Sequence, residues 1–337
     1  MEKIRDTRWD VLKGILILCV LYRHFLIYGG SISYIASKTV ANYVHVFTMP
    51  LFVFVSGYFT KHVDETKRYW RGILGVFETY AVFQVFKGLL YQYSIWQLIS
   101  FPALMMWYLL ALVIWKIVYF CLNKMKIKVN GILITCLVLI ALVVGFVPFI
   151  GENFALSRIF YFAPYFFLGI MLQNVKVIDE IKCRLKAPIA WLILIIALIS
   201  SLMIAVNNAF YIVDGVFQGN EPYPEEGKWF FMGLRFLSYL VSFIVSISVV
   251  RLFVNTNRIL EIVGKDSLKF YIFHGFGLMA FGLLPITWKY GLAVVYATIV
   301  SLIIFFFNKT KFSDFAVRPI KYVVDIITSK NKTIQDG

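Results

Sequence analysis

The residues of this chain most able to do chemistry are ionisable groups inside long apolar segments. His24 lies thirteen residues into the segment that begins at Val11, and Lys13 precedes it by eleven residues. In a helix this spacing places the two side chains about 20° apart in facing and roughly 16 Å apart in height. Asp10 precedes Lys13 by three residues, so the two can form an ion pair. A neutral imidazole is the usual general base near pH 7, so His24 is suited to remove a proton. The alternative interpretation fits the spacing equally well: Lys13 anchors the membrane edge and His24 is a hydrogen-bonded packing residue.

Three further histidines are His45, His62 and His274. His45 opens the second apolar segment, and His274 lies within the ninth with Tyr271 one turn before it. His62 lies in a charged loop, and we assign it no role. The chain contains neither an HExxH nor an HxxxH motif, and its cysteines form no CxxC pair, so the sequence predicts no metal site.

A pair of arginines follows the second apolar segment. Arg68 and Arg71 are three residues apart at the expected start of a helix, so they share one face of it. A helix N-terminus with two guanidinium groups is suited to hold phosphates. The alternative interpretation is that the pair only anchors the cytoplasmic edge of the membrane.

Several other charged side chains fall inside apolar segments, where each needs a partner or water because a lone charge in a bilayer is costly. They are Glu78, Lys87, Lys116 and Arg235. Arg23 is next to His24, faces about 100° away from it, and is expected to extend to the outer interface.

The composition indicates which elements must hold these residues. The chain has 337 residues, of which 61% are hydrophobic and only 15% are charged, whereas a soluble domain has roughly 25% charged residues. Unbroken apolar runs of about 20 residues cross a bilayer as helices. We therefore expect an all-α polytopic membrane protein with about ten transmembrane helices, over residues 11–28, 44–60, 73–93, 103–121, 130–150, 159–174, 188–206, 229–254, 267–286 and 289–308.

The distribution of Lys and Arg predicts the orientation of the chain. If the N-terminus lies in the cytoplasm, the inner segments hold 25 basic residues and the outer segments hold 4. Segments 1–10 and 309–337 then form a cytoplasmic N-terminus and a basic cytoplasmic tail around one membrane domain, 11–308. The net charge of +15 is spread over separate inner loops, which favours membrane topology over nucleic-acid binding.

Five stretches stand out in order along the chain. They are Arg8–Ile17 with His24, Met49–Tyr58, Trp107–Leu112, Arg158 with Pro164–Gly169, and Ile262–Leu268 with Tyr271 and His274. Together they resemble the membrane-bound acyltransferase 3 family, and within it the branch of fucose-4-O-acetylase-like enzymes and polysaccharide O-acetyltransferases. The resemblance covers nearly the whole chain.

This resemblance implies an integral enzyme of the cytoplasmic membrane. Such an enzyme moves an acyl group, usually acetyl from acetyl-CoA, to a hydroxyl of a surface polysaccharide or of a lipid-linked glycan precursor. The family's catalytic histidine corresponds to His24, and its first-span basic residue, often arginine, corresponds to Lys13. Asp10 joins these two as a catalytic candidate through its pairing with Lys13. The family's RxxR pair corresponds to Arg68 and Arg71, which with Lys13 would hold the phosphates of CoA.

The resemblance also indicates where this chain departs from the family. Relatives often have a histidine just before the Met-Pro of the second segment, where this chain has Thr48. His45, one turn earlier, either takes over that role or the role is absent. Further candidate site residues are Arg158 and His274.

The chemistry of the transfer leaves several points open. The oxyanion formed from the thioester needs hydrogen-bond donors, for which Ser56, Tyr58 and Tyr271 are candidates. His24 could act as a base in direct transfer or form an acyl-histidine. A polysaccharide exporter without acyl transfer is the alternative function, because charges within about ten spans suit it too. We expect membrane lipid and a glycan acceptor as partners, acetyl-CoA as donor, no metal and no nucleic acid; the oligomeric state stays undetermined.

Overall fold

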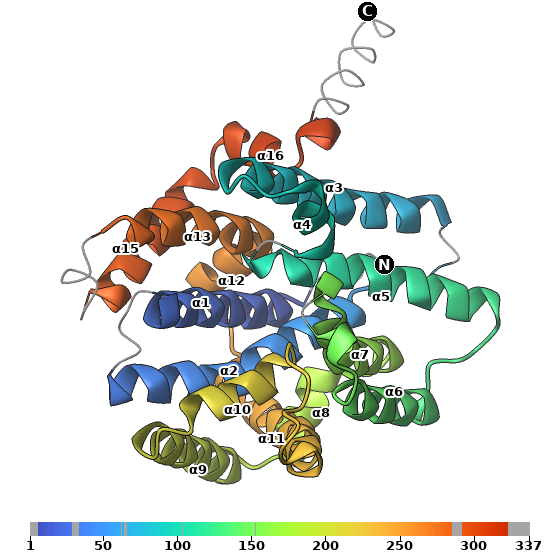
Figure 1. Cartoon of the computed structure of the whole chain (residues 1–337), viewed down its shortest axis with the longest axis vertical. Coiled ribbons are helices and arrows are strands. Elements are labelled where there is room, and N and C mark those ends of the chain that lie inside the picture. Colours follow the sequence, from blue (N-terminus) through green and yellow to red (C-terminus); the bar gives the residue numbers. More distant parts are fainter. Residues whose placement is uncertain are drawn as a thin grey trace, which may run out of the picture. The chain divides into compact units, whose positions relative to one another are not determined.

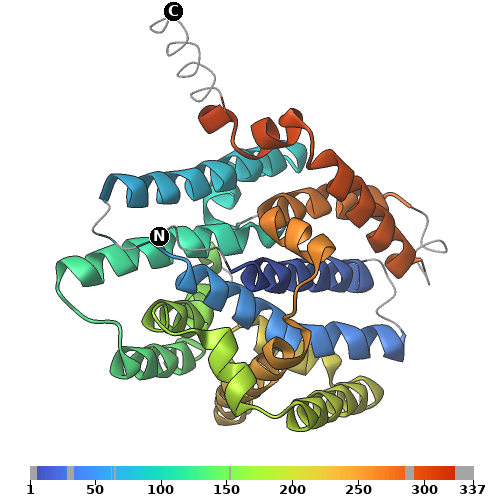
Figure 2. The same cartoon turned by 180° about the vertical axis from the view of Figure 1, so that it is seen from behind.

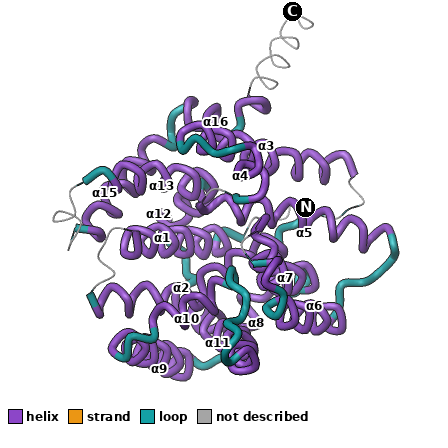
Figure 3. Tube along the Cα trace, viewed as in Figure 1, coloured by secondary structure: helices purple, strands orange, loops and turns teal. Residues whose placement is uncertain are grey.

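The computed structural model describes residues 6–28, 34–61, 63, 66–102, 104–151, 153–284 and 292–322. Over these residues the chain is helical, with loops and short 3₁₀ turns and no strand, as Figure 3 shows. The all-α prediction is confirmed. His62 and Lys289 lie outside the described residues.

The chain divides into two compact units, which are described separately. Unit 1 comprises Met1–Thr60 and Lys128–Ser301, and unit 2 comprises Lys61–Ile127 and Leu302–Gly337. The helices of unit 1 are α1 (Arg8–Tyr28), α2 (Ile35–Tyr58), α6 (Gly131–Val144), α7 (Leu156–Met171), α8 (Val177–Arg184), α9 (Ala187–Val206), α10 (Phe210–Gln218), α11 (Lys228–Phe253), α12 (Arg258–Lys265), α13 (Ser267–Gly282) and most of α15 (Ala293–Phe307).

Within unit 1, α1 and α2 are the central helices. Helix α1 packs against α2, α12 and α13, while α2 also packs against α7, α9, α10 and α11. Both views of the molecule show α1 between α2 on one side and the α12–α13 pair on the other (Figures 1 and 2). The candidate histidines of the first, second and ninth apolar segments are therefore held on neighbouring helices.

Two helix crossings in unit 1 depend on glycine. A Cβ at Gly14 would collide with the carbonyl oxygen of Leu260, and a Cβ at Gly264 would collide with that of Asp10. These two glycines let the backbones of α1 and α12 touch, as small residues commonly do where membrane helices cross. Gly57 of α2 and Gly169 of α7 form an equivalent crossing, in which each would collide with backbone of the other helix.

Unit 2 contains α3 (Thr66–Leu90), α4 (Ile95–Ser100), α5 (Trp107–Lys124) and α16 (Lys311–Val317). The Tyr69 hydroxyl of α3 donates a hydrogen bond of 2.6 Å to the carbonyl oxygen of Lys116 in α5. The carboxylate of Glu78 accepts the backbone N–H of Ile320 at 2.7 Å, so this charge has the partner that its position requires.

Among the described residues, seven helical segments are long and apolar enough to cross a membrane: α1, α2, α3, α5, α9, α11 and the segment Asn153–Met171, which joins a short 3₁₀ turn to α7. An eighth is formed if α15 and α16, which meet at a bend of 104°, count as one span. The chain is thus a multi-pass membrane protein. Each of the ten predicted ranges contains a helix, but α6 has 14 residues and α13 has 16. Ten spans and cytoplasmic termini stay predictions.

The run 130–150 shows why apolarity overstates helix length. Helix α6 begins at its Asn130 cap, whose side chain accepts the N–H of Leu133, and it ends at Val144. Gly145 follows, and Pro148 then opens a 3₁₀ turn because proline cannot continue the helical hydrogen bonding. Apolar composition continues through residues that are no longer α-helical.

Candidate active site

The imidazoles of His24 and His274 meet where α1 packs against α13. His24 Nδ1 lies 2.9 Å from His274 Nε2, and His274 Nδ1 lies 3.0 Å from the carbonyl oxygen of Phe270. The two ring planes are only 4° apart. His274 is fully buried, whereas His24 is partly exposed. One histidine is therefore fixed in the core and the other is accessible beside it.

The partners of this pair determine which nitrogens carry hydrogen. A backbone carbonyl can only accept, so His274 Nδ1 is the protonated nitrogen of that ring. Neutral His274 then has a lone pair on Nε2, which accepts the Nδ1–H of His24. Neutral His24 consequently has its own lone pair on Nε2. This is the nitrogen that can take a proton from, or attack, another molecule.

A second cluster surrounds the carboxylate of Asp214 in α10. Asp214 Oδ1 pairs with Arg23 and lies 2.8 Å from His45 Nδ1, and Oδ2 accepts a hydrogen bond of 2.7 Å from Gln218. Arg23 also lies 3.0 Å from the same His45 Nδ1, so this nitrogen contacts both a guanidinium, which can only donate, and a carboxylate, which can only accept. The arrangement is a buried cluster of an arginine, an acid and a histidine.

Arg23 differs from its sequence-based expectation. We expected it to extend to the outer interface, but it is buried, with 7% of its surface exposed. The reason is electrostatic: Asp214 supplies an opposite charge within the protein, which a buried guanidinium requires. Burial alone raises the pKa of the Asp214 carboxyl, but the charge of Arg23 and the contact with His45 outweigh it, so this pKa lies well below its usual range.

The two clusters are neighbours. Arg23 and His24 are adjacent in α1, and Arg23, His45 and Arg158 lie close enough for their charges to act on the His24 ring. Arg158, in the first turn of α7, donates a hydrogen bond of 3.2 Å to Gln218. The structure therefore gathers His24, His45, Arg158 and His274 of the predicted residues in one region of unit 1.

Lys13 and Asp10 lie elsewhere on the same helix. Their side chains pair at 2.6 Å, which confirms the ion pair predicted from their spacing. Since α1 is continuous from Arg8 to Tyr28, eleven residues separate Lys13 from His24 by about 16 Å. The pair and the histidine thus mark two ends of one helix and do not touch a common small group.

The three hydroxyls considered as oxyanion donors separate in the same way. Ser56 donates to the carbonyl oxygen of Phe52, and Tyr58 donates to that of Val175, each at 2.9 Å. Tyr58 also stacks on Trp9, at the Lys13 end of α1. Tyr271, by contrast, is buried with its ring centroid 6.1 Å from that of His274. Only Tyr271 of the three is adjacent to the histidine pair.

Arg68 and Arg71 lie in the first turns of α3, and both are exposed. The helix confirms that they share one face, as their spacing predicts. They belong to unit 2, whereas the histidine pair belongs to unit 1. A role of these arginines in binding CoA phosphates stays a prediction.

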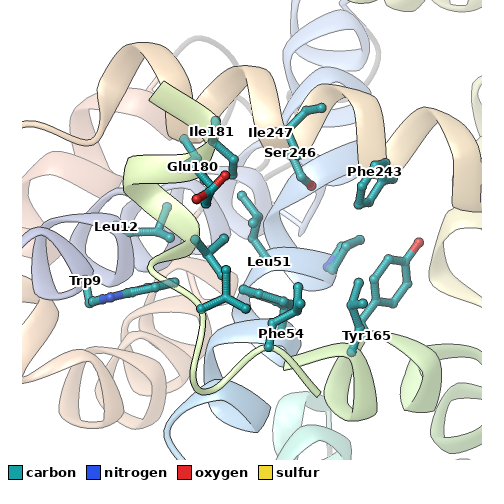
Figure 4. A pocket seen from close by; sticks show the side chains of 16 residues that line it. Trp9, Leu12, Leu51, Phe54, Tyr165, Glu180, Ile181, Phe243, Ser246 and Ile247 are labelled. Atoms are coloured by element: carbon teal, nitrogen blue, oxygen red, sulfur yellow. The ribbon is translucent and has the colours of Figure 1, made fainter. Parts of the chain in front are cut away.

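An apolar pocket of about 220 Å³ lies beside the first turns of α1. Figure 4 shows Trp9 and Leu12 of α1, Leu51 and Phe54 of α2, and Ile181 of α8 around it, with the carboxylate of Glu180 at its edge. Its walls suit a hydrocarbon and not phosphates. Among the residues that the structure describes, no three His, Cys, Asp or Glu side chains gather in a metal-binding group.

Asp214 is the residue that sequence reasoning missed. It falls between the predicted spans 188–206 and 229–254, and the structure places it in α10, a helix of 9 residues. The available signal was a single acid among apolar residues, in the stretch Phe210–Phe217. Inside an apolar segment such a group needs a buried cation.

Comparison with known families gives one match. The sequence model of the acyltransferase 3 family, described as an acyltransferase domain, matches residues 6–307. Comparisons with curated proteins and with solved structures gave no match.

Proposed function

The chain belongs to the acyltransferase 3 family and is a membrane acyltransferase, and we propose that it transfers acetyl from acetyl-CoA to a hydroxyl of a surface polysaccharide or its lipid-linked precursor. In this proposal the protein is a multi-pass enzyme of the cytoplasmic membrane. Membership of this family also favours acyl transfer over the alternative of a polysaccharide exporter.

The hydrogen-bond chain from Phe270 through His274 to His24 is the observation that carries this proposal. It leaves the basic lone pair of His24 on Nε2, on a ring that is partly exposed. A hydroxyl is a weak nucleophile, so Nε2 removes its proton while the oxygen attacks the thioester carbonyl. The carbon–sulfur bond then breaks, and the proton passes from His24 to the departing thiolate of CoA. The buried His274 keeps the His24 ring in the orientation that both steps need.

Two further parts of the proposal concern charge. The ring of Tyr271 lies beside that of His274, and we propose that the Tyr271 hydroxyl assists the oxyanion of the thioester. Arg68, Arg71 and Lys13 are proposed to bind the CoA phosphates on the cytoplasmic side. Lys13 offers one rotatable point charge where many relatives have the planar fork of arginine, so it would attract phosphate without bidentate geometry.

The test is acetyl transfer in membrane vesicles that contain the full chain. Radiolabelled acetyl-CoA is supplied to vesicles carrying the native membrane glycans, and label in the glycan fraction is measured. His24→Ala should lower the rate by about 10²–10⁴-fold, the usual contribution of a general base. Cys136→Ala, at an exposed position of α6, is the matched control and should transfer at the wild-type rate. A wild-type rate in His24→Ala would overturn the assignment.

The same assay separates direct transfer from an acyl-histidine. Both routes use the Nε2 lone pair, but only the acyl-histidine retains label on the protein when acceptor is removed. Denatured wild-type protein should carry no label under the direct route. Label that is present in wild type and absent in His24→Ala would establish the covalent route.

A further inference from the structure

A second and larger cavity, of about 450 Å³, lies between α2, α9, α10 and α11. Its size falls in the range of sites that hold organic ligands. Aliphatic side chains of α9 and α11 form most of its wall, including Ile193, Ile196, Ile204, Leu237, Ile244 and Val245. Both helices are candidate membrane spans, and α9 has one of the most apolar sequences in the chain. Walls of this composition favour a hydrocarbon chain as the occupant of the cavity.

The cavity adjoins the candidate active site. Phe217 of α10 lines the cavity, and its ring centroid is 6.3 Å from that of His45. The same short helix carries Asp214, which contacts His45. The wall of the cavity and the Asp214 cluster therefore share α10, and Phe217 contacts both the cavity and His45.

One polar group in the wall lacks a partner. Asn42 of α2 lines the cavity with only 1% of its surface exposed, and its Oδ1 accepts no hydrogen bond from the described residues. A buried carbonyl oxygen without a donor is destabilising. Asn42 precedes His45 by three residues, so both lie on the same side of α2. The unpartnered oxygen calls for an occupant that carries a donor such as a hydroxyl.

A positive charge lies at one end of the side of α2 that carries Asn42 and His45. Lys38 precedes Asn42 by four residues, and its ammonium lies 5.9 Å from the ring centroid of Tyr211 in α10. The nearby carboxylate of Asp214 is already paired with Arg23. Lys38, Asn42 and Val46 thus run from a cation through a hydrogen-bond acceptor to the apolar wall. This sequence of groups matches an anionic headgroup, a hydroxyl and a hydrocarbon chain.

We propose that this cavity binds the acceptor, and that the acceptor is a saccharide carried on a lipid phosphate. The inference rests on the proposed acyl transfer and narrows its substrate to the lipid-linked class. The hydrocarbon chain occupies the cavity, the phosphate pairs with Lys38, and a hydroxyl of the lipid-linked molecule donates to Asn42. The saccharide is thereby held next to α10, where a further hydroxyl reaches His24.

Binding is tested separately from catalysis. Purified full-length protein in nanodiscs is titrated with a fluorescently labelled polyprenyl phosphate, and with phosphatidylglycerol that carries the same label. Ala197→Trp fills the cavity from α9, whereas Ile199→Trp adds the same ring at an exposed position of that helix. We expect Ala197→Trp to weaken polyprenyl phosphate binding at least tenfold and Ile199→Trp to leave it unchanged. Lys38→Gln should weaken it several-fold, and equal thermal unfolding midpoints show that the variants are folded.

Transfer is then measured with lipid-linked saccharide from native membranes and with the same saccharide released by mild acid. The wild type should acetylate the linked form at a KM at least tenfold lower, and Ala197→Trp should lose this advantage. Equal KM values for the two forms, or unchanged polyprenyl phosphate binding in Ala197→Trp, would refute the inference. Binding of phosphatidylglycerol in preference to polyprenyl phosphate would refute it too, and would identify a structural lipid.

The proposed function fails in a different way. His24→Ala should bind polyprenyl phosphate as the wild type does while it loses transfer. In a second outcome, the wild type binds the lipid through this cavity but acetylates neither form of the saccharide. That result would support the lipid-binding site and would refute both the acetyl transfer and the role of the lipid-linked saccharide as acceptor.

Discussion

Replacing His274 with alanine removes the acceptor of the His24 Nδ1–H while leaving the rest of α1 in place. The lost bond measures 2.9 Å, and without it His24 can take either neutral tautomer and can rotate. A buried donor deprived of its partner costs about 1–3 kcal/mol, and each 1.4 kcal/mol corresponds to a factor of ten. The cost falls on the reactive geometry, so we expect kcat to fall by about 10–100-fold and the KM for acetyl-CoA to change little. His274→Gln can accept the same hydrogen through its amide oxygen and should recover most of the rate.

The assay is the transfer of radiolabelled acetyl at saturating donor, compared across wild type, His274→Ala, His274→Gln and His24→Ala. A positioning role predicts that His274→Ala is impaired less than His24→Ala and that glutamine rescues it. A wild-type kcat in His274→Ala would refute the tautomer argument. Loss as large as in His24→Ala, with no rescue by glutamine, would show instead that His274 contacts the reacting atoms.

Three further predictions concern Asp214 and the crossing of α1 with α12. Asp214→Asn leaves the buried charge of Arg23 without its counter-charge and should destabilise the fold by about 3–5 kcal/mol, whereas the double variant with Arg23→Met should recover much of the thermal unfolding midpoint. The pKa of the Asp214 carboxyl is lower in the folded than in the unfolded protein, so its ionised form stabilises the fold at pH values above the ordinary pKa near 4. This stabilisation is lost as the pH falls below that value, where the thermal unfolding midpoint of the wild type should decrease more steeply than that of Asp214→Asn. Gly264→Ala places a methyl group against the carbonyl oxygen of Asp10 and should cost about 1–3 kcal/mol by the same measurement, while Gly233→Ala, which meets nothing within 4 Å, should be neutral; equal midpoints for the two would contradict the crossing.

Local features of this protein were predictable from its sequence, and the reason is geometric. The Lys13–Asp10 pair follows from a spacing of three residues in a helix, and the structure contains it at 2.6 Å. The contact of His24 with His274 joins residues 250 positions apart. The sequence identified both as ionisable groups within apolar segments, but helical periodicity carries no information about which distant helix packs against which.

Asp214 shows a different limit. An acidic residue in a connection between two spans is normally solvated, and the apolar residues around Asp214 were the one local sign that it is buried. Its burial depends on Arg23 of α1 facing the same interior, which is a property of the assembled helices. The same lack of tertiary information explains Arg23, which a helical wheel places away from His24 without showing what it meets there.

The glycine crossing of α1 with α12 sets a mechanical tolerance for the proton-transfer pair. Helix α12 ends at Lys265, one residue after the crossing, and α13 begins at Ser267, so His274 lies seven residues, or about 10 Å, along an arm formed by α13. A shift of a few tenths of an ångström at Gly264 is carried along this arm to the imidazoles. Gly14 and Gly264, which are far from the reacting atoms, therefore help to set the distance between the two imidazoles. A small displacement at this crossing would lower the rate of transfer before it lowered the stability of the fold.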